Sequence, residues 1–229
     1  MRSLAVSLAL VALSGLGCKS DPVAPYRARG VATFDKLRAL AQKPLPTLTS
    51  DTLKPPEPLK EVYDTGGNLA VYAQESLATP EVAFARGSAF DTEMSLRDPS
   101  QWLHGPVDKY TSPRAVTEGL ETLMRLKYVF VVKTLDYRPP VIADKTYTMG
   151  VFAGEAHLFD LDGNYYGGVR VSANSSKTVD FHYNVDKKTG ASWGNNEVAN
   201  VDFDLKSHGW EALRVAAAKA APGTYLRPH

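Results

Sequence analysis

The fold is decided by residues 149–173, which read MGVFAGEAHLFDLDGNYYGGVRVSA. Residues 149–160 and 165–173 carry valine and aromatic side chains of the kind that favour strands. Between them, residues 161–164 contain an Asp-Gly pair, which favours a tight hairpin turn. The adjacent Gly167 and Gly168 indicate a strand bulge or a point of close packing. This stretch therefore predicts two long antiparallel strands joined by a short turn.

Further strands are expected on both sides of this hairpin. Residues 128–132, YVFVV, are β-branched or aromatic throughout, which predicts a strand buried on both faces. Pro139 and Pro140 end that strand. Residues 178–186 alternate between apolar and polar side chains, which predicts a half-exposed strand. The sheet is therefore expected to have about four strands, mainly antiparallel.

Helices are expected at both ends of the chain and before the strand at 128. Apolar side chains recur near helical spacing in residues 27–42, and two prolines follow closely. The Ser-Pro pair at 112–113 starts a helix that runs to about residue 126. Residues 207–221 keep helical spacing until Pro222 and Gly223, whereas 198–205 fit either a helix or a strand. The predicted class is α+β, with helices flanking the sheet.

Other stretches have less decisive patterns. Residues 43–58 contain five prolines and are expected to form a semi-extended linker or a loop laid over a surface. Residues 69–77 and 82–94 each fit either a strand or a helix. Trp102 is expected to anchor a loop to the core, and residues 187–196 are predicted to form a polar loop.

The first 17 residues have the order of a secretory signal peptide. Arg2 supplies a positive charge, residues 4–13 are apolar apart from Ser7, and small residues precede Cys18. The apolar run is too short to cross the roughly 30 Å hydrocarbon core of a bilayer as a helix. A buried N-terminal helix is the alternative, but nothing polar marks a second face. We therefore expect an exported protein.

Leu16, Gly17 and Cys18 resemble the lipobox of bacterial lipoproteins, in which a small residue precedes the cysteine that becomes the lipidated N-terminus. Gly17 matches the small position, whereas Gly15 stands where the pattern usually has Leu. The resemblance implies a diacylglycerol on Cys18 and usually an amide-linked acyl chain, such as palmitate. By the same resemblance, Lys19 indicates the outer membrane, because an Asp in that place favours the inner one.

The cysteine count and the net charge limit the kinds of protein that this chain can be. Cys18 is the only cysteine, so the chain forms no internal disulfide. Without Arg2, the 26 Lys and Arg residues become 25 and balance the 25 Asp and Glu residues. A charge near zero argues against a nucleic-acid-binding protein. We expect a signal peptide in 1–17, a lipid anchor, tether, helix and proline-rich linker in 18–58, and an α+β domain in 59–229.

Residues 160–164, DLDGN, offer oxygen ligands of the kind that calcium prefers. A full calcium-binding loop needs a bidentate Glu about twelve positions in, and Val171 stands there. The hairpin turn explains every residue of this stretch without a metal. The sequence therefore predicts a turn here.

His157 and His182, together with Asp180 and Asp186, are a possible zinc-binding set. No His-Glu-x-x-His or paired-cysteine pattern supports it, and a polar face exposed to solvent explains these side chains. The chain also lacks a Gly-x-Ser-x-Gly elbow and a phosphate-binding loop. We therefore expect no catalytic, cofactor-binding or metal-ligating residue, and Cys18 as the one modified site.

The leading hypothesis is a membrane-anchored lipoprotein of the cell envelope that is not an enzyme and binds another protein or the cell-surface matrix. A small-ligand or lipid carrier, with a groove between sheet and helices, is the alternative. A hydrolase without a recognisable motif is the third, if His157 or His182 lies within reach of a Ser or a carboxylate. Exposed tyrosines could line an interaction surface, or they could pack in the sheet core: Tyr147, Tyr165, Tyr166 and Tyr183.

Overall fold

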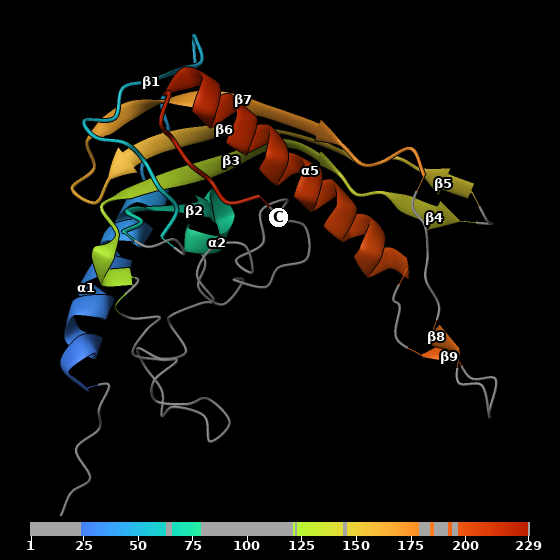
Figure 1. The fold of residues 1–229 in the computed structure, drawn as a ribbon, viewed down its shortest axis with the longest axis horizontal. Coiled ribbons are helices and arrows are strands. Elements are labelled where there is room, and N and C mark those ends of the chain that lie inside the picture. The colour runs from blue at the N-terminus through green and yellow to red at the C-terminus, as the bar shows by residue number, and fades with distance from the viewer. Residues whose placement is uncertain are drawn as a thin grey trace, which may run out of the picture.

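A twisted five-stranded sheet lies at the centre of the computed structural model (Figure 1). The structure describes residues 24–62, 66–78, 121, 123–143, 146–178, 184–185, 192–193 and 197–228. Helices and strands are present in similar amounts and the sheet is mainly antiparallel, so the predicted α+β class is confirmed. The elements are, in chain order, α1 (Ala24–Ala41), β1 (Thr52–Leu53), β2 (Leu69–Ala73), α2 (Gln74–Ala78), β3 (Tyr128–Arg138), β4 (Val141–Ala143), β5 (Thr146–Thr148), β6 (Val151–Asp160), β7 (Tyr165–Asn174), β8 (Asn184–Val185), β9 (Ser192–Trp193) and α5 (Glu197–Ala220).

The predicted hairpin is confirmed as β6 and β7, which pair antiparallel. Their turn is closed by Asp160, whose Oδ1 accepts hydrogen bonds from the backbone N–H groups of Asp162 and Asn164, both at 2.9 Å. Gly163 takes a φ of 91°, a conformation that favours glycine. Local turn chemistry therefore fixes the register of β6 and β7.

β3 contains the predicted buried strand and continues beyond it to Arg138, where the prolines follow. Its first five residues are buried, as their composition predicts. β3 pairs antiparallel with β6 and parallel with β2, giving the strand order β1-β7-β6-β3-β2. Three of the four expected strands lie in this sheet, as β3, β6 and β7, and β1 and β2 are additional to the prediction. The described part of the strand expected at 178–186 is β8, which pairs with β9 in a separate two-stranded sheet. β2 adds a parallel pair that no local pattern indicated.

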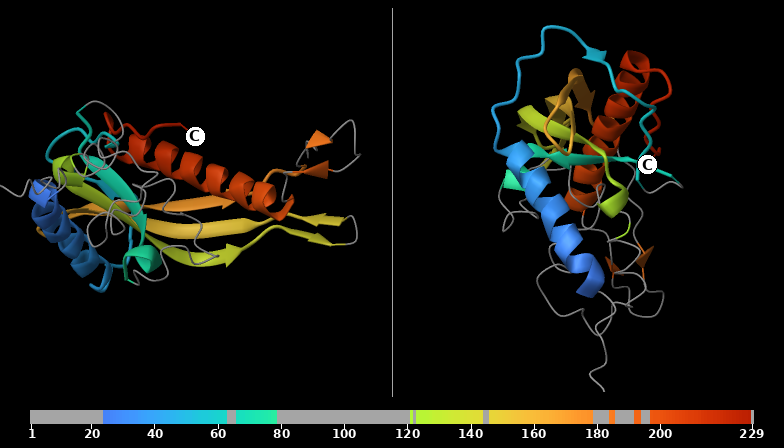
Figure 2. Two further views of the ribbon diagram at one scale, coloured as in Figure 1. Left: turned by 90° about the horizontal axis from the view of Figure 1, so that it is seen from below. Right: turned by 90° about the vertical axis from the view of Figure 1, so that its left-hand side faces the viewer.

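The alternation of side chains along β3 builds two hydrophobic cores, one on each face of the sheet. Phe130 and Val132 pack against α5 on one face, which we call the α5 face. Val129 and Val131 pack against α1 on the other, the α1 face. Figure 2 shows the sheet between these two helices. The described helices include none with the length and apolar character needed to cross a membrane.

The structure decides most of the stretches that the sequence left open. Residues 69–77 form both elements, since β2 is followed directly by α2. The ambiguous start of the last helix is helical, and α5 ends before Pro222 as predicted. The proline-rich stretch lies along the sheet as a loop, but it also contributes strand β1. The polar loop at 187–196 likewise contains β9, which pairs with β8, so neither stretch is loop throughout.

Two elements precede the domain boundary expected at residue 59. Helix α1 packs against the sheet, and β1 is one of its strands. Leu37 and Leu40 of α1 are buried in the core of the α1 face. β1 lies so close to β7 that a β-carbon on Gly167 would be 2.0 Å from the Thr52 carbonyl oxygen. The close packing predicted for this glycine is therefore confirmed. The predictions for residues 82–94, Trp102, residues 112–120 and most of 178–186 lie outside the described residues.

Candidate functional site

An open groove of about 720 Å³ runs between β7 and α5 on the α5 face of the sheet. Its volume lies within the range of roughly 300–1,000 Å³ that is usual for ligand sites. Backbone and side chains of β7 form one wall and a row of α5 side chains forms the other. The lining residues are Asp51, Arg170, Val171, Ser172, Ala173, Asn174, His208, Glu211, Ala212, Val215, Ala216, Lys219 and Ala220.

The helix wall follows from the spacing of small residues along α5. Ala212, Ala216 and Ala220 are four residues apart, so they share one face of the helix. Their short side chains keep that face shallow where it passes β7. Val215 beside them is 52 % exposed although it is apolar. These α5 side chains, Ala212, Val215, Ala216 and Ala220, form the apolar floor of the groove, and the floor remains open to solvent.

The strand wall is an edge of the sheet that β1 covers only in part. β1 pairs with Gly167 and Gly168, and the rest of β7 extends past it. The backbone N–H of Arg170 donates to Asp51 Oδ1 at 3.1 Å, so the backbone groups of Arg170 point away from β6, toward the open edge of the sheet. Because alternate residues of a strand face the same neighbour, the N–H and C=O of Ser172 also face outward. Within the described residues, no hydrogen bond joins them to another strand.

Side chains cap the groove at its two ends. Asp51 closes one end, where it also accepts from Arg170 Nε at 2.9 Å. His208 closes the other, with its Nδ1 2.6 Å from the Asn174 carbonyl oxygen, so that Nδ1 carries the proton that is donated. Only about three residues of β7 therefore present backbone groups to an incoming chain.

The charges at the Asp51 end leave an excess of one positive charge. The hydrogen bond from Arg170 keeps the pKa of Asp51 below its usual value, although partial burial opposes this, and Lys219 adds a smaller effect in the same direction. The charge of Arg170 is compensated by its ion pair with Asp51, and Glu155 also acts on it, so Lys219 supplies the remaining positive charge. Lys219 is exposed, so this end of the groove can attract an anion.

At the His208 end the acidic side chains have polar partners within the protein, since Asp204 accepts hydrogen bonds from the Ser176 backbone N–H and hydroxyl. Glu211 accepts a hydrogen bond from Arg214 Nε at 2.6 Å, and this contact lowers the pKa of Glu211. His208 Nε2 lies 3.9 Å from Asp204 Oδ1. The groove is thus polarised, with its positive end at Lys219.

His157 is buried in the sheet, so the expectation that it lies on a solvent-exposed polar face is wrong. Its side chain is 0 % exposed, and its Nε2 lies 3.4 Å from Glu155 Oε2. Its Nδ1 lies 3.4 Å from the Tyr165 hydroxyl. Burial lowers the pKa of His157, while the Glu155 carboxylate opposes the shift and Lys133 reinforces it.

This cluster bears on the hydrolase hypothesis. A carboxylate is near His157, but the ring itself is enclosed, and among the described residues no serine hydrogen-bonds to it. A base that takes a proton from a substrate must reach it within about 3 Å or through one water. The geometry therefore gives His157 a place in the sheet interior and no direct access to a substrate. His182, Asp180 and Asp186 lie outside the described residues.

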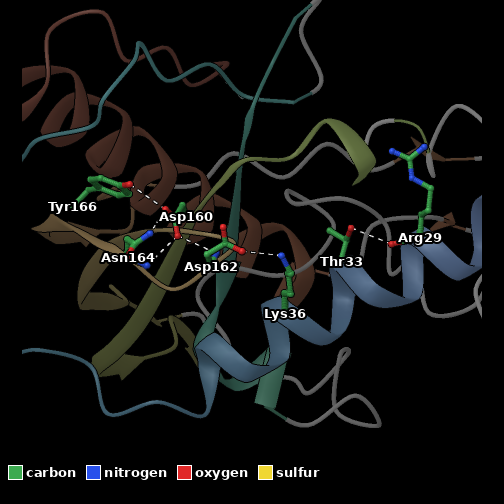
Figure 3. A network of polar contacts seen from close by, with 7 residues as sticks. All are labelled: Arg29, Thr33, Lys36, Asp160, Asp162, Asn164 and Tyr166. Atoms are coloured by element: carbon green, nitrogen blue, oxygen red, sulfur yellow. Dashed lines mark hydrogen bonds and ion pairs between the residues drawn. The ribbon is translucent and has the colours of Figure 1, made fainter.

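Hydrogen bonds within the protein explain the acidic turn considered for calcium (Figure 3). Asp160 Oδ2 accepts from the Asn164 amide at 2.7 Å and from the Tyr166 hydroxyl at 3.0 Å. Although burial opposes ionisation, these bonds lower the pKa of Asp160. Asp162 pairs with Lys36 of α1 at 2.8 Å. Within the described part of the chain, no three His, Cys, Asp or Glu side chains gather as a metal site would require.

The tyrosines divide between surface and interior. Tyr165 is 38 % exposed, whereas Tyr166 packs edge-on against Tyr128 with ring centres 5.9 Å apart. The Tyr147 hydroxyl lies 2.6 Å from Ser175 Oγ. None of these three lines the groove. Tyr183 and Cys18 lie outside the described residues.

Comparison of the chain with protein-family models, curated proteins and solved structures finds no match. The groove residues were not among the side chains that sequence reasoning selected. The four-residue repeat of alanines in α5 was the available signal, but small residues at that spacing also occur where a helix packs closely on a sheet.

Proposed function

We propose that this chain is an exported lipoprotein of the cell envelope, held in the outer membrane through lipid on Cys18, and that it is not an enzyme but binds an envelope protein. The observation that carries the binding role is the groove between β7 and α5. It combines an apolar floor, a polarised pair of ends and outward-facing backbone groups of Ser172. Such a surface suits an extended polypeptide, because a sheet edge supplies main-chain hydrogen bonds.

The anchor and the groove are compatible in space. α1 begins six residues after Cys18, and an extended chain of that length spans at most about 20 Å. The N-terminal end of α1 is therefore held near the membrane. The groove lies beside α5, and α5 and α1 are on opposite faces of the sheet (Figure 2), so a partner has access to it. Two or three acyl chains would make the attachment stable, whereas one alone binds only marginally.

A site-specific crosslink tests the binding role. A photoreactive amino acid at Val215, inside the groove, should give one reproducible protein adduct in intact envelopes. The control is the same group at Leu135 on β3, which is exposed to a similar extent, 54 % against 52 %. An adduct at Val215 that is absent at Leu135 supports the proposal. Equal labelling at both positions, or none at Val215 in repeated trials, contradicts it.

The anchor has a separate test. Cys18→Ala should abolish incorporation of labelled fatty acid and leave an uncleaved precursor, because the thiol is the attachment point. Ser20→Ala, two residues further on, is the matched control and should be labelled like the unaltered chain. Fatty-acid incorporation into the Cys18→Ala variant would show that the lipid is elsewhere.

The same groove supports a second candidate function, a carrier of a small ligand or lipid. Its apolar floor and its volume suit a small amphipathic molecule with an anionic head. Native mass spectrometry of the full chain released from detergent distinguishes the two candidates. A reproducible mass increment that Val215→Glu abolishes favours the carrier, and a clean apo mass favours the protein-binding role.

A further inference from the structure

We propose that the groove holds the extended C-terminal tail of a partner protein, antiparallel to β7, with its free α-carboxylate beside Lys219, near the end closed by the Arg170–Asp51 ion pair. The inference rests on the proposed function, because it names the kind of polypeptide that the groove accepts. Three features carry it: the short open edge of β7, the block at one end of that edge, and the charge at the block.

The open edge fits a short extended segment. Ser172 offers an N–H and a C=O to the groove, and its neighbours at Arg170 and Asn174 are each partly capped by a side chain. An antiparallel segment would exchange both hydrogen bonds with Ser172 through a single residue. Its flanking residues would lie beside the caps. The edge therefore recognises a segment of about three residues and cannot hold a long strand.

The block at Arg170 sets where that segment must stop. β1 occupies the edge at Gly167 and Gly168, and the Asp51 carboxylate fills the position beside the Arg170 N–H. A strand added to β7 therefore cannot continue past Arg170. An internal segment would have to turn sharply out of the groove at this point, whereas a chain terminus simply ends there.

The charge at the closed end of the edge determines whether the N-terminus or the C-terminus of a partner chain fits there. β7 runs from Tyr165 to Asn174, so an antiparallel segment arrives at Arg170 with its C-terminal end. Because Arg170 and Asp51 neutralise each other, Lys219 supplies one positive charge at this end, which matches one α-carboxylate. A parallel segment would bring an N-terminal ammonium to the same place, where the excess positive charge repels it. Charge complementarity therefore favours the antiparallel direction and a free C-terminus.

The floor of the groove selects the side chains of the tail. Successive side chains of an extended segment point to opposite sides, so every second one meets α5. There it lies against Ala212, Val215 and Ala216, which leave room for an apolar group. The tail should therefore carry an aliphatic residue at one or both positions that face the helix, and its other side chains should face solvent.

Peptide libraries test the inference on the full chain in detergent. Two random heptapeptide libraries differ only at the C-terminus, one with a free carboxylate and one amidated. We expect retention of free-carboxylate peptides with aliphatic residues near the end, and at least a roughly tenfold loss of affinity on amidation. Equal retention of both libraries would overturn the carboxylate inference and leave the protein-binding function standing. Retention of neither, with a Val215 crosslink still seen, would overturn the inference in the same way.

Two variant pairs localise the binding. Ser172→Pro removes the outward N–H, which an edge strand tolerates, and should weaken a retained peptide by roughly fivefold or more, whereas Ser172→Ala should bind normally. Lys219→Gln should weaken free-carboxylate peptides but not amidated ones. Lys133→Gln, on the α1 face, is its control with the same charge change. Full affinity of both Ser172→Pro and Lys219→Gln, with unchanged melting temperatures, would exclude this groove as the tail site.

Discussion

The two faces of the sheet differ in how they end. On the α5 face, apolar side chains from all five strands pack under one long helix, and the cover stops at β7 with a row of alanines. On the α1 face, a shorter helix covers the ends of β2 and β3, and charged side chains follow. There Lys133, Glu155 and Arg170 stand side by side on adjacent strands. Opposite charges in such cross-strand positions stabilise a solvated sheet surface. Among the described residues, the α5 face therefore combines an apolar surface with an open sheet edge, at the groove between β7 and α5.

The largest expected effect is on the free energy of unfolding, and it should be greater for the core of the α5 face than for that of the α1 face. Trp210→Ala should reduce the free energy of unfolding by about 3–5 kcal/mol, because this buried side chain lies in the larger core and its Nε1 donates to the Arg227 carbonyl. Leu37→Ala, its counterpart in α1, should cost about 2–3 kcal/mol. Denaturant unfolding of the full chain measures both. A larger loss for Leu37→Ala would mean that the α1 face carries more of the stability.

The pH dependence of stability should arise mainly from the α1 face. Burial holds the pKa of His157 below the unfolded value of about 6.5, so the unfolded chain binds the proton more readily. Stability is therefore fully present above pH 6.5 and falls as the pH drops below it, by at most about 1.4 kcal/mol per pH unit. The loss continues down to the folded pKa. Denaturant unfolding at pH 7.5, 6 and 5 follows it.

Two variants assign that pH dependence. His157→Gln keeps a polar group of similar size but cannot titrate, and it should remove the slope between pH 7.5 and 5. His208→Gln, at the exposed end of the groove, should keep it. Persistence of the full slope in His157→Gln would place the titrating group elsewhere.

The smallest expected effect is the link between α1 and the hairpin turn. Lys36 and Asp162 pair at 2.8 Å, but their side chains are 53 % and 76 % exposed. Exposed ion pairs contribute roughly 0–1 kcal/mol and weaken with salt. Lys36→Ala should therefore change the free energy of unfolding by less than about 1 kcal/mol, and the difference should vanish at 1 M salt. A larger change that persists in salt would indicate that packing of the lysine stem holds α1 in place.

Local patterns in the sequence determined the elements that the chain builds from neighbouring residues. The Asp-Gly turn placed β6 and β7, the apolar run at 128 placed the buried half of β3, and Pro222 placed the end of α5. Each of these signals acts over a few residues, through backbone geometry or side-chain periodicity. They were sufficient for the α+β class. The signal-peptide pattern and Cys18 remain the basis of the proposed envelope location.

Only the tertiary structure decided what lies beside these elements. β1 reaches Gly167 and Gly168 across more than a hundred residues, and β2 joins β3 in parallel, although neither pairing has a local signature. The burial of His157 follows from what covers its strand, since its neighbours in sequence predicted a polar surface. The groove likewise exists because α5 crosses an edge that β1 leaves partly open. Side-chain periodicity records which face a residue takes, whereas the partner of that face is set by long-range packing.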